Sequence, residues 1–432
     1  MEDKNKIIKN LFWQIWDKIV ILILEFFVGI KIANYFGVKM YGVYSYSLSL
    51  VLFSRISYEL INKRVVIKEY LTEEDNLVIE LATFYKVLIG LAITLILYIY
   101  VQDLEIRKIV LVLAIIEVVR AYSFKYEVYS EINFNIKMYV IINNITKIII
   151  YLLQYFLILL NKNIYTIILL SLFGEFFRVF LLVKILPNYG KKKLDRKIIV
   201  RKFKPLLEES FYFFIGYIYF IVFTQIDKIM LGYYISKEYV GIYNIAVQLT
   251  NVLAIFFVPI QNTLYPLLIK INQQSEKKYL ELWQDYNTII TYLYLILTIL
   301  SVFVVKYTFN YIFSNEYIES IKVYNILALM VFLKANTILR MIHINIYDLG
   351  KILLKLSFIG IVLNIILNYI FLLKFGMLGV AVASVITQLF VGNILYFFFK
   401  EGKIIFKIQY KSFNPFNLWI LIKKYNKSKY LY

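Results

Sequence analysis

The chain has 432 residues, of which 61% are hydrophobic and only 18% are charged. A soluble domain of ordinary composition carries roughly 25% charged residues, so this chain has more apolar surface than a water-soluble fold can bury. The formal net charge of +20 comes from basic residues that gather in alternate predicted loops, which is typical of membrane topology and leaves no basic domain for nucleic acid. Cysteine is absent, which excludes disulfides and thiolate metal sites.

Apolar runs of about 20 residues, each long enough to cross a hydrocarbon layer of about 30 Å as a helix, recur from one end of the chain to the other. They predict an all-α polytopic membrane protein. The twelve expected spans are 11–34, 41–62, 78–101, 108–129, 138–160, 164–186, 206–232, 239–268, 286–312, 320–347, 352–373 and 376–399. The polar start MEDKNKIIKN is followed by no small-residue cleavage site, so we expect it to be retained.

Basic residues are concentrated on one side of these spans, above all in GKKKLDRKIIVRKFK (190–204) and in the tail KKYNKSKY. By the positive-inside rule that side is cytoplasmic. An even number of spans then predicts two cytoplasmic termini, with the chain in the cytoplasmic (inner) membrane. We expect an N-terminal six-helix lobe at 1–186, a basic linker at 187–205, a C-terminal six-helix lobe at 206–399 and a basic tail at 400–432.

A weak internal repeat marks two predicted turns. YFGVKMYGVYSYSLSL (35–50) and MLGYYISKEYVGIYNIAVQL (230–249) share an apolar-Gly step and a Gly-x-Tyr that opens the next helix, and KFGMLGVAVASVITQL (374–389) is a third echo. Glycine permits turns and close helix approach, and tyrosine suits the headgroup level. The repeat predicts tight hairpins at corresponding points of two halves, as in transporters that arose by duplication.

Charged and polar residues also occur inside the predicted spans. The first span carries Asp17, Lys18 and Glu25, and each charge at a helix centre costs about 2.5–3.5 kcal/mol by insertion scales. Such side chains face a bundle interior or a wet cavity. The strongest candidates for a cavity lining are Lys18, Lys147 and Arg340, because none has a carboxylate one turn away. The other candidates are Arg55, Arg178, Asn143, Gln154, Asn244, Gln248 and Asn336.

These residues also have structural interpretations. Three pairs have the spacing of local ion pairs that fix helix packing: Arg55 with Glu59, Glu117 with Arg120, and Glu175 with Arg178. Alternatively, Arg120 extends towards an interface. His343, the single histidine, has packing as its ordinary role and a proton switch as the alternative.

Several kinds of chemistry have no signal in the sequence. It contains no Walker A loop, no cluster of histidine and carboxylates for a metal, and no serine or cysteine triad. The sequence therefore predicts neither an enzyme nor a cofactor.

The segment TQIDKIMLGYYISKEYVGIYNIAVQLTNVLAIFFVPIQNTLYPLLIKI (224–271) resembles the Wzx-type polysaccharide flippases of the multidrug/oligosaccharidyl-lipid/polysaccharide (MOP) exporter superfamily. The matching positions are Asp227, Met230-Leu231-Gly232, Ser236, Glu238, Val240-Gly241-Ile242-Tyr243, Ala246, Pro259 and Pro266. The turn at 35–50 looks like the first turn of that family. With the expected topology, the resemblance extends over essentially the whole chain.

The resemblance implies a MATE-like pair of six-helix lobes around a cation-lined cavity. It implies a flippase that moves undecaprenyl-diphosphate-linked oligosaccharide repeat units from the inner to the outer leaflet by alternating access, for O-antigen, capsule or another surface polysaccharide. The implied partners are this lipid-linked oligosaccharide, membrane lipids, and a polysaccharide polymerase with a chain-length regulator. Glu25, Asp17 and Asp227 are the candidates for ion coupling, although local pairing with Lys228 is the structural alternative for Asp227.

Two alternatives stay open at this point. A cation-coupled drug exporter or lipid II exporter would keep the fold and change the cargo. Drug exporters favour acidic cavities, whereas isolated intramembrane cations suit an anionic headgroup. A membrane-embedded polysaccharide polymerase would need a sizeable outer loop with catalytic residues, and the predicted outer loops are short.

Overall fold

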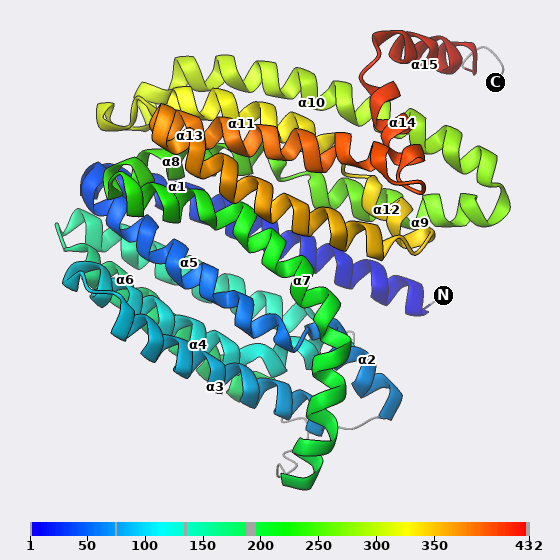
Figure 1. Cartoon of the computed structure of the whole chain (residues 1–432). Helices are drawn as coiled ribbons and strands as arrows, with labels where there is room; N and C mark the ends of the chain where they lie inside the picture. The colour runs from blue at the N-terminus through cyan, green and yellow to red at the C-terminus, as the bar shows by residue number, and fades with distance from the viewer. Residues whose placement is uncertain (1, 74–75, 134–135, 187–195, 429–432) are drawn as a thin grey trace. The chain divides into compact units, whose positions relative to one another are not determined.

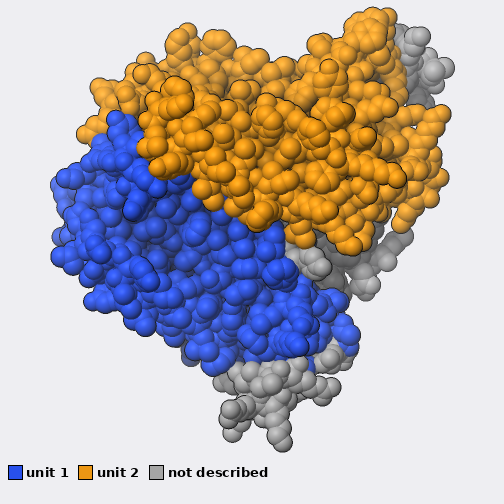
Figure 2. All heavy atoms as spheres, viewed as in Figure 1, with its two compact units in different colours: residues 1–241 blue, residues 242–432 orange. Residues whose placement is uncertain are grey.

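The structure, a computed structural model, describes residues 2–73, 76–133, 136–186 and 196–428, without the side chains of residues 2–12, 14–15, 18, 73, 196–201, 212 and 425–428. Within these ranges the chain is helical and has no β-strand (Figure 1). It forms two compact units, residues 1–241 and 242–432 (Figure 2). The lobes expected on either side of the linker 187–205 stay a prediction, because residues 187–195 lie outside the described ranges.

Nine helical stretches of the described chain are long and apolar enough to cross a membrane. Two of them contain glycine breaks, at Gly37 in α1 (Glu2–Ser54) and at Gly376 in α13 (Gly350–Gly392). Helix α4 (Leu104–Ile132) has 29 residues, also enough to cross a membrane, but carries charged residues among its apolar ones. Dividing α1 and α13 at their glycines and adding α4 reproduces the twelve spans that the sequence predicts.

The outward surfaces of these helices are apolar. In α3 (Leu77–Tyr100) the side chains of Leu88, Leu91, Leu95 and Ile99 are all exposed. A water-soluble protein rarely exposes such a continuous apolar stripe. The exposed apolar stripe and the lengths of the helices both indicate that the chain is a multi-pass membrane protein.

Unit 1 is a bundle built around α4. The 3₁₀ helix η1 (Arg55–Leu60) and α2 (Lys63–Glu73) follow α1, and the later helices are α5 (Ile136–Leu159), α6 (Ile164–Ile185) and α7 (Arg196–Tyr234). Helix α4 packs against α1, α3 and α6, while α5 packs against α1 and α6, and α7 against α1 and η1. A polar cap starts α4: the Asp103 carboxylate accepts the N–H groups of Glu105 and Ile106.

Unit 2 holds α8 (Lys237–Ala254) from Ile242 onward, α9 (Phe257–Gln274), α10 (Glu276–Ile312), α11 (Ser320–Ala335), α12 (Arg340–Ile346), α13, α14 (Lys403–Ser412) and α15 (Pro415–Ser428). Helix α11 packs against α10 and α13, and α14 packs against α10. The helix breaks between α8 and α9 at residues 255–256. Pro259 explains the break, because it lacks the N–H that would bond to the carbonyl of Ile255.

The two glycine-tyrosine turns of the sequence repeat contact one another within unit 1. A Cβ atom added to Gly42 would lie 1.9 Å from the carbonyl oxygen of Lys237, and one added to Gly241 would lie 2.8 Å from that of Val38. The Lys237 ammonium lies over the Tyr46 ring, 4.5 Å from its centroid. Backbone therefore touches backbone here, which only glycine allows.

Candidate functional site

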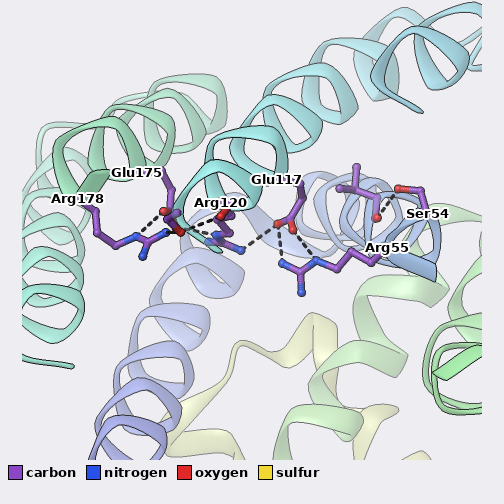
Figure 3. A network of polar contacts seen from close by, with 8 residues as sticks. Ser54, Arg55, Glu117, Arg120, Glu175 and Arg178 are labelled. Atoms are coloured by element: carbon purple, nitrogen blue, oxygen red, sulfur yellow. Dashed lines mark hydrogen bonds and ion pairs between the residues drawn. The ribbon is translucent and has the colours of Figure 1, made fainter. Parts of the chain in front are cut away.

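Five ionic side chains of unit 1 form a continuous chain of contacts that crosses three elements (Figure 3). Arg55 of η1 donates two hydrogen bonds to the Glu117 carboxylate of α4, at 2.5 and 2.6 Å. Arg120 of α4 then bridges Glu117, at 2.9 Å, and Glu175 of α6, at 2.7 Å. Arg178 ends the chain with a 2.7 Å bond from its Nε to Glu175.

This chain of contacts lies near the middle of its membrane helices. Glu175 is close to the midpoint of α6 (Ile164–Ile185), and the side chains of Glu117 and Glu175 are only 11% and 9% exposed. A buried carboxylate is tolerable when it is paired and hydrogen-bonded, and each of these two has two guanidinium partners. Three arginines against two glutamates leave one formal positive charge.

The expected local pair between Arg55 and Glu59 is wrong. Residues 55–60 form a 3₁₀ helix, in which three residues make a turn, so positions four apart do not share a face. Arg55 therefore reaches across to α4, while Glu59 accepts a 2.8 Å hydrogen bond from Asn62. The pair of Glu175 with Arg178 is confirmed, but it is part of the larger network.

A cavity of about 250 Å³ opens beside Arg55 and Arg120. Its lining consists of Arg55, Tyr58, Glu59, Lys86, Glu117, Arg120, Ala121, Phe124, Glu127 and Tyr217. Lys86 of α3 is 5% exposed, and its ammonium donates to the Tyr58 carbonyl at 2.5 Å and lies 4.8 Å from the centre of the Phe124 ring. The cavity thus combines three cations with three carboxylates and with aromatic side chains, so it offers both hydrogen-bond donors and acceptors to a polar group.

The structure brings some predicted residues of α5 near this network and gives others packing roles. Lys147 makes no hydrogen bond or ion pair with the described residues, in agreement with its isolation in sequence. Asn143 donates to the Asp17 carboxylate of α1 at 2.8 Å. Gln154 is 3% exposed and joins α5 to α6 through the Ile167 carbonyl and the Ser171 hydroxyl.

The predicted residues of unit 2 sit in tight contacts. The Arg340 guanidinium donates to the Gly392 carbonyl and lies 4.8 Å from the centre of the Tyr396 ring. Asn336 is fully buried and donates to Thr291 at 2.9 Å. Asn244 and Gln248 are half-buried in α8, within the same unit.

His343 has the packing role that its sequence context favours. It is 3% exposed, its ring stacks on Trp283 with centroids 4.2 Å apart, and its Nδ1 lies 3.0 Å from the Tyr279 hydroxyl. These three rings join α10 to α12, so the histidine is part of the core of unit 2.

The candidates for ion coupling differ in their surroundings. Glu25 is exposed on α1, whereas Asp227 and Lys228 are buried in α7, with 5% and 6% exposure. Lys18 belongs to α1, and its side chain lies outside the described residues. Among the described residues no group of three histidines, cysteines or carboxylates is placed to hold a metal ion.

Most residues that line the cavity are not among the predicted site residues, and three of them carry the charges nearest to Arg55: Lys86, Glu117 and Arg120. Arg120 does not extend towards an interface, because Glu117 and Glu175 hold it. A signal was present for all three, since each is an ionisable residue inside a predicted span. Sequence spacing pairs residues within one helix, and it contains nothing that shows pairing between helices.

The fold is similar to those of solved polytopic membrane transporters. A lipid II flippase, MurJ, in an inward closed conformation, is similar with a TM-score of 0.70 and 16% identity, over 97% of this chain and 93% of that one. An inward-facing multidrug resistance MATE family transporter of the MOP superfamily is similar with a TM-score of 0.59 and 13% identity, over 93% of this chain and 96% of that one. The all-α MATE/MOP-like fold expected from the sequence is confirmed.

The chain belongs to the family described as "Polysaccharide biosynthesis protein", whose model matches residues 32–322. It is 27% identical over 212 residues to an uncharacterized membrane protein, MJ1068, of Methanocaldococcus jannaschii, and 24% identical over 204 residues to a probable low-salt glycan biosynthesis flippase, Agl15, of Haloferax volcanii. These matches cover 47% and 46% of this chain and 40% and 41% of the relatives, so the chain spans about two fifths of the length of each.

Proposed function

We propose that this protein is a flippase for lipid-linked glycan precursors with an anionic headgroup. The observation that carries the proposal is the chain of arginines and glutamates among the membrane helices of unit 1, in a protein of the polysaccharide biosynthesis family. The similarity to a probable low-salt glycan biosynthesis flippase, which covers 46% of this chain, supports the same function.

The cargo is a glycan repeat unit on undecaprenyl diphosphate. Arg55 presents to Glu117 the two-pronged N–H fork that also binds phosphate oxygens. A diphosphate entering the cavity of about 250 Å³ would replace that carboxylate and would meet Lys86 and Arg120 beside it. The glycan would contact Tyr58 and Tyr217, and the prenyl chain would stay in the lipid.

The remaining predicted residues belong to the same proposal. Lys18 and Arg340 are proposed as further headgroup contacts, and Asn143, Gln154, Asn244, Gln248 and Asn336 as polar lining. Transport runs from the inner to the outer leaflet of the cytoplasmic membrane by alternating access. The termini are cytoplasmic, the product feeds a surface polysaccharide such as O-antigen or capsule, and a polymerase with a chain-length regulator follows in the same process.

The test compares arginine variants in a translocation assay. The purified protein is reconstituted in liposomes with a fluorescent prenyl-diphosphate oligosaccharide, and a glycosidase outside the liposomes reports transfer between leaflets. We expect Arg55→Gln to lower the rate about tenfold, the equivalent of about 1.4 kcal/mol, because the headgroup loses its two-pronged contact. Arg340→Ala tests unit 2 in the same assay.

Arg107→Gln is the matched control. This arginine lies in the first turn of α4, bonds to the Val101 carbonyl at 2.6 Å and is not part of the network. It should transport at the wild-type rate. Equal rates for Arg55→Gln and wild type would remove Arg55 from the proposed site, and no acceleration by the wild type over empty liposomes would refute the function.

A further inference from the structure

A second, smaller cavity lies within unit 1, among α4, α5 and α6. Its volume is about 70 Å³, and its lining consists of Arg120, Thr146, Lys147, Ile150, Tyr151, Ser171, Gly174, Glu175 and Arg178. Arg120 lines both this cavity and the larger one. The smaller cavity is a separate space with its own donors.

The charges around this cavity do not balance. Arg120, Lys147 and Arg178 line it, and Glu175 is the one carboxylate in the lining. Glu117 contacts Arg120 from the other side but is itself bonded to Arg55. Uncompensated positive charge at this depth of a membrane helix is costly, and proteins compensate it with a counter-charge or with water.

Carboxylates of α1 do not supply that counter-charge at contact distance. Asp17 and Glu25 are near enough to attract the Lys147 ammonium, but neither forms an ion pair with it. The Asp17 carboxylate accepts a hydrogen bond from Asn143 instead. Lys147 is thus a membrane-embedded cation without a direct partner among the described residues.

Two residues of α5, Lys147 and Tyr151, offer hydrogen-bond donors to the cavity. Lys147 and Tyr151 are four residues apart, so they lie one above the other on the same helix face, and both line the cavity. Neither the Lys147 ammonium nor the Tyr151 hydroxyl has a hydrogen-bond partner among the described residues. By contrast, the Thr146 and Ser171 hydroxyls donate to carbonyls of their own helices.

We propose that the small cavity is a binding site for one small inorganic anion, of the size of chloride or bromide. Its donors are the Lys147 ammonium, the Tyr151 hydroxyl and the N–H groups of Arg120 and Arg178 that Glu117, Glu175, Ser123 and Tyr139 leave free. A space of about 70 Å³ holds a few water molecules, which is enough for a small ion and too little for a sugar diphosphate.

With this anion bound, Lys147 is an anion ligand and not the headgroup contact that the sequence predicts. The anion would balance the excess positive charge and would hold α5 against α4 and α6 through charge-assisted hydrogen bonds. The inference goes beyond the proposed transport and does not depend on which lipid the protein carries.

The test measures thermal unfolding of the purified full-length protein in detergent, in sodium chloride, sodium bromide and sodium gluconate at equal ionic strength. A ligand that binds the folded state alone raises the Tm, and we expect a saturable rise of about 2 °C or more in chloride and bromide over gluconate. Lys147→Gln should lose that rise and Tyr151→Phe should reduce it. Lys184→Gln, which changes an exposed lysine at the end of α6, should keep it.

Bromide also locates the site directly. In crystals grown with bromide, we expect an anomalous-difference peak in hydrogen-bond contact with the Lys147 ammonium. The proposal is overturned if wild type unfolds at the same Tm in halide and gluconate, or if Lys147→Gln responds as wild type does. A rise with pyrophosphate that exceeds the rise with halides would instead make the cavity part of a headgroup site. No lipid cargo is present, so the outcome is independent of the translocation assay.

Discussion

Glu175 is the residue on which the polar chain of unit 1 depends most. It accepts hydrogen bonds from Arg120 of α4 and from Arg178 of its own helix, both at 2.7 Å, and its side chain is 9% exposed. One carboxylate thus compensates two guanidinium groups near the middle of α6 (Ile164–Ile185). Its neutralisation would leave both arginines without their shared counter-charge.

Glu175→Gln should therefore lower the free energy of unfolding by about 3–5 kcal/mol, the usual cost of removing one partner of a buried pair. The measurement is thermal unfolding in detergent. Glu209→Gln is the matched control, because Glu209 pairs with Lys68 while both side chains are 45% and 66% exposed, and such a pair contributes at most about 1 kcal/mol. An equal decrease in the free energy of unfolding in the two variants would mean that the network does not stabilise unit 1.

At this scale the sequence predicts which residues are polar inside the membrane better than it predicts their partners. Lys147 is isolated in sequence and makes no ion pair with the described residues. Arg55 pairs with Glu117, 62 residues away, and the spacing rule for helices misses this because it covers one helix at a time. Lys86 is not among the predicted site residues, although a charged residue inside an apolar span is itself a signal of a functional site.

At the scale of elements, the glycine-tyrosine turns hold α1 against the start of α8. Gly42 faces the Lys237 carbonyl and Gly241 faces that of Val38. A methyl group at either position would meet main-chain atoms, which cannot move aside as a flexible side chain can.

Gly42→Ala should destabilise the protein by about 1–3 kcal/mol, the usual cost of overpacking. Gly216→Ala offers a control in α7, because a Cβ atom there would meet nothing within 4 Å. In that helix alanine is favoured over glycine by about 1 kcal/mol, so the control should unfold at the wild-type temperature or slightly above. The opposite order of the two Tm values would contradict the contact between the turns.

The repeat in the sequence predicts that these turns are tight, and the structure confirms it through the glycine breaks and the backbone contacts. The sequence contains no information that the first two turns touch, because a repeat shows likeness and not proximity. The third echo corresponds to the break at Gly376, where φ is 57°. The first turn likewise corresponds to the break at Gly37, where φ is 70°.

For the whole molecule, the distribution of lysine and arginine predicts a definite orientation in the membrane. The natural chain has no cysteine, so single cysteines report their side without background. Ser236, between α7 and α8, lies on the predicted outer side, and Ser275, between α9 and α10, on the cytoplasmic side. A membrane-impermeant maleimide should label Ser236→Cys in intact cells and Ser275→Cys only after permeabilisation. The reverse pattern would invert the proposed direction of transport.

The central claim is that the protein moves lipids because their headgroups are anionic. The most direct measurement compares two cargoes in liposomes containing the wild-type protein: one oligosaccharide linked to a prenyl diphosphate, and the same oligosaccharide on an uncharged prenyl ether. The account predicts that the protein accelerates the movement of the diphosphate cargo between leaflets and leaves the neutral cargo at the rate of empty liposomes. Equal acceleration of both, or of neither, would contradict it.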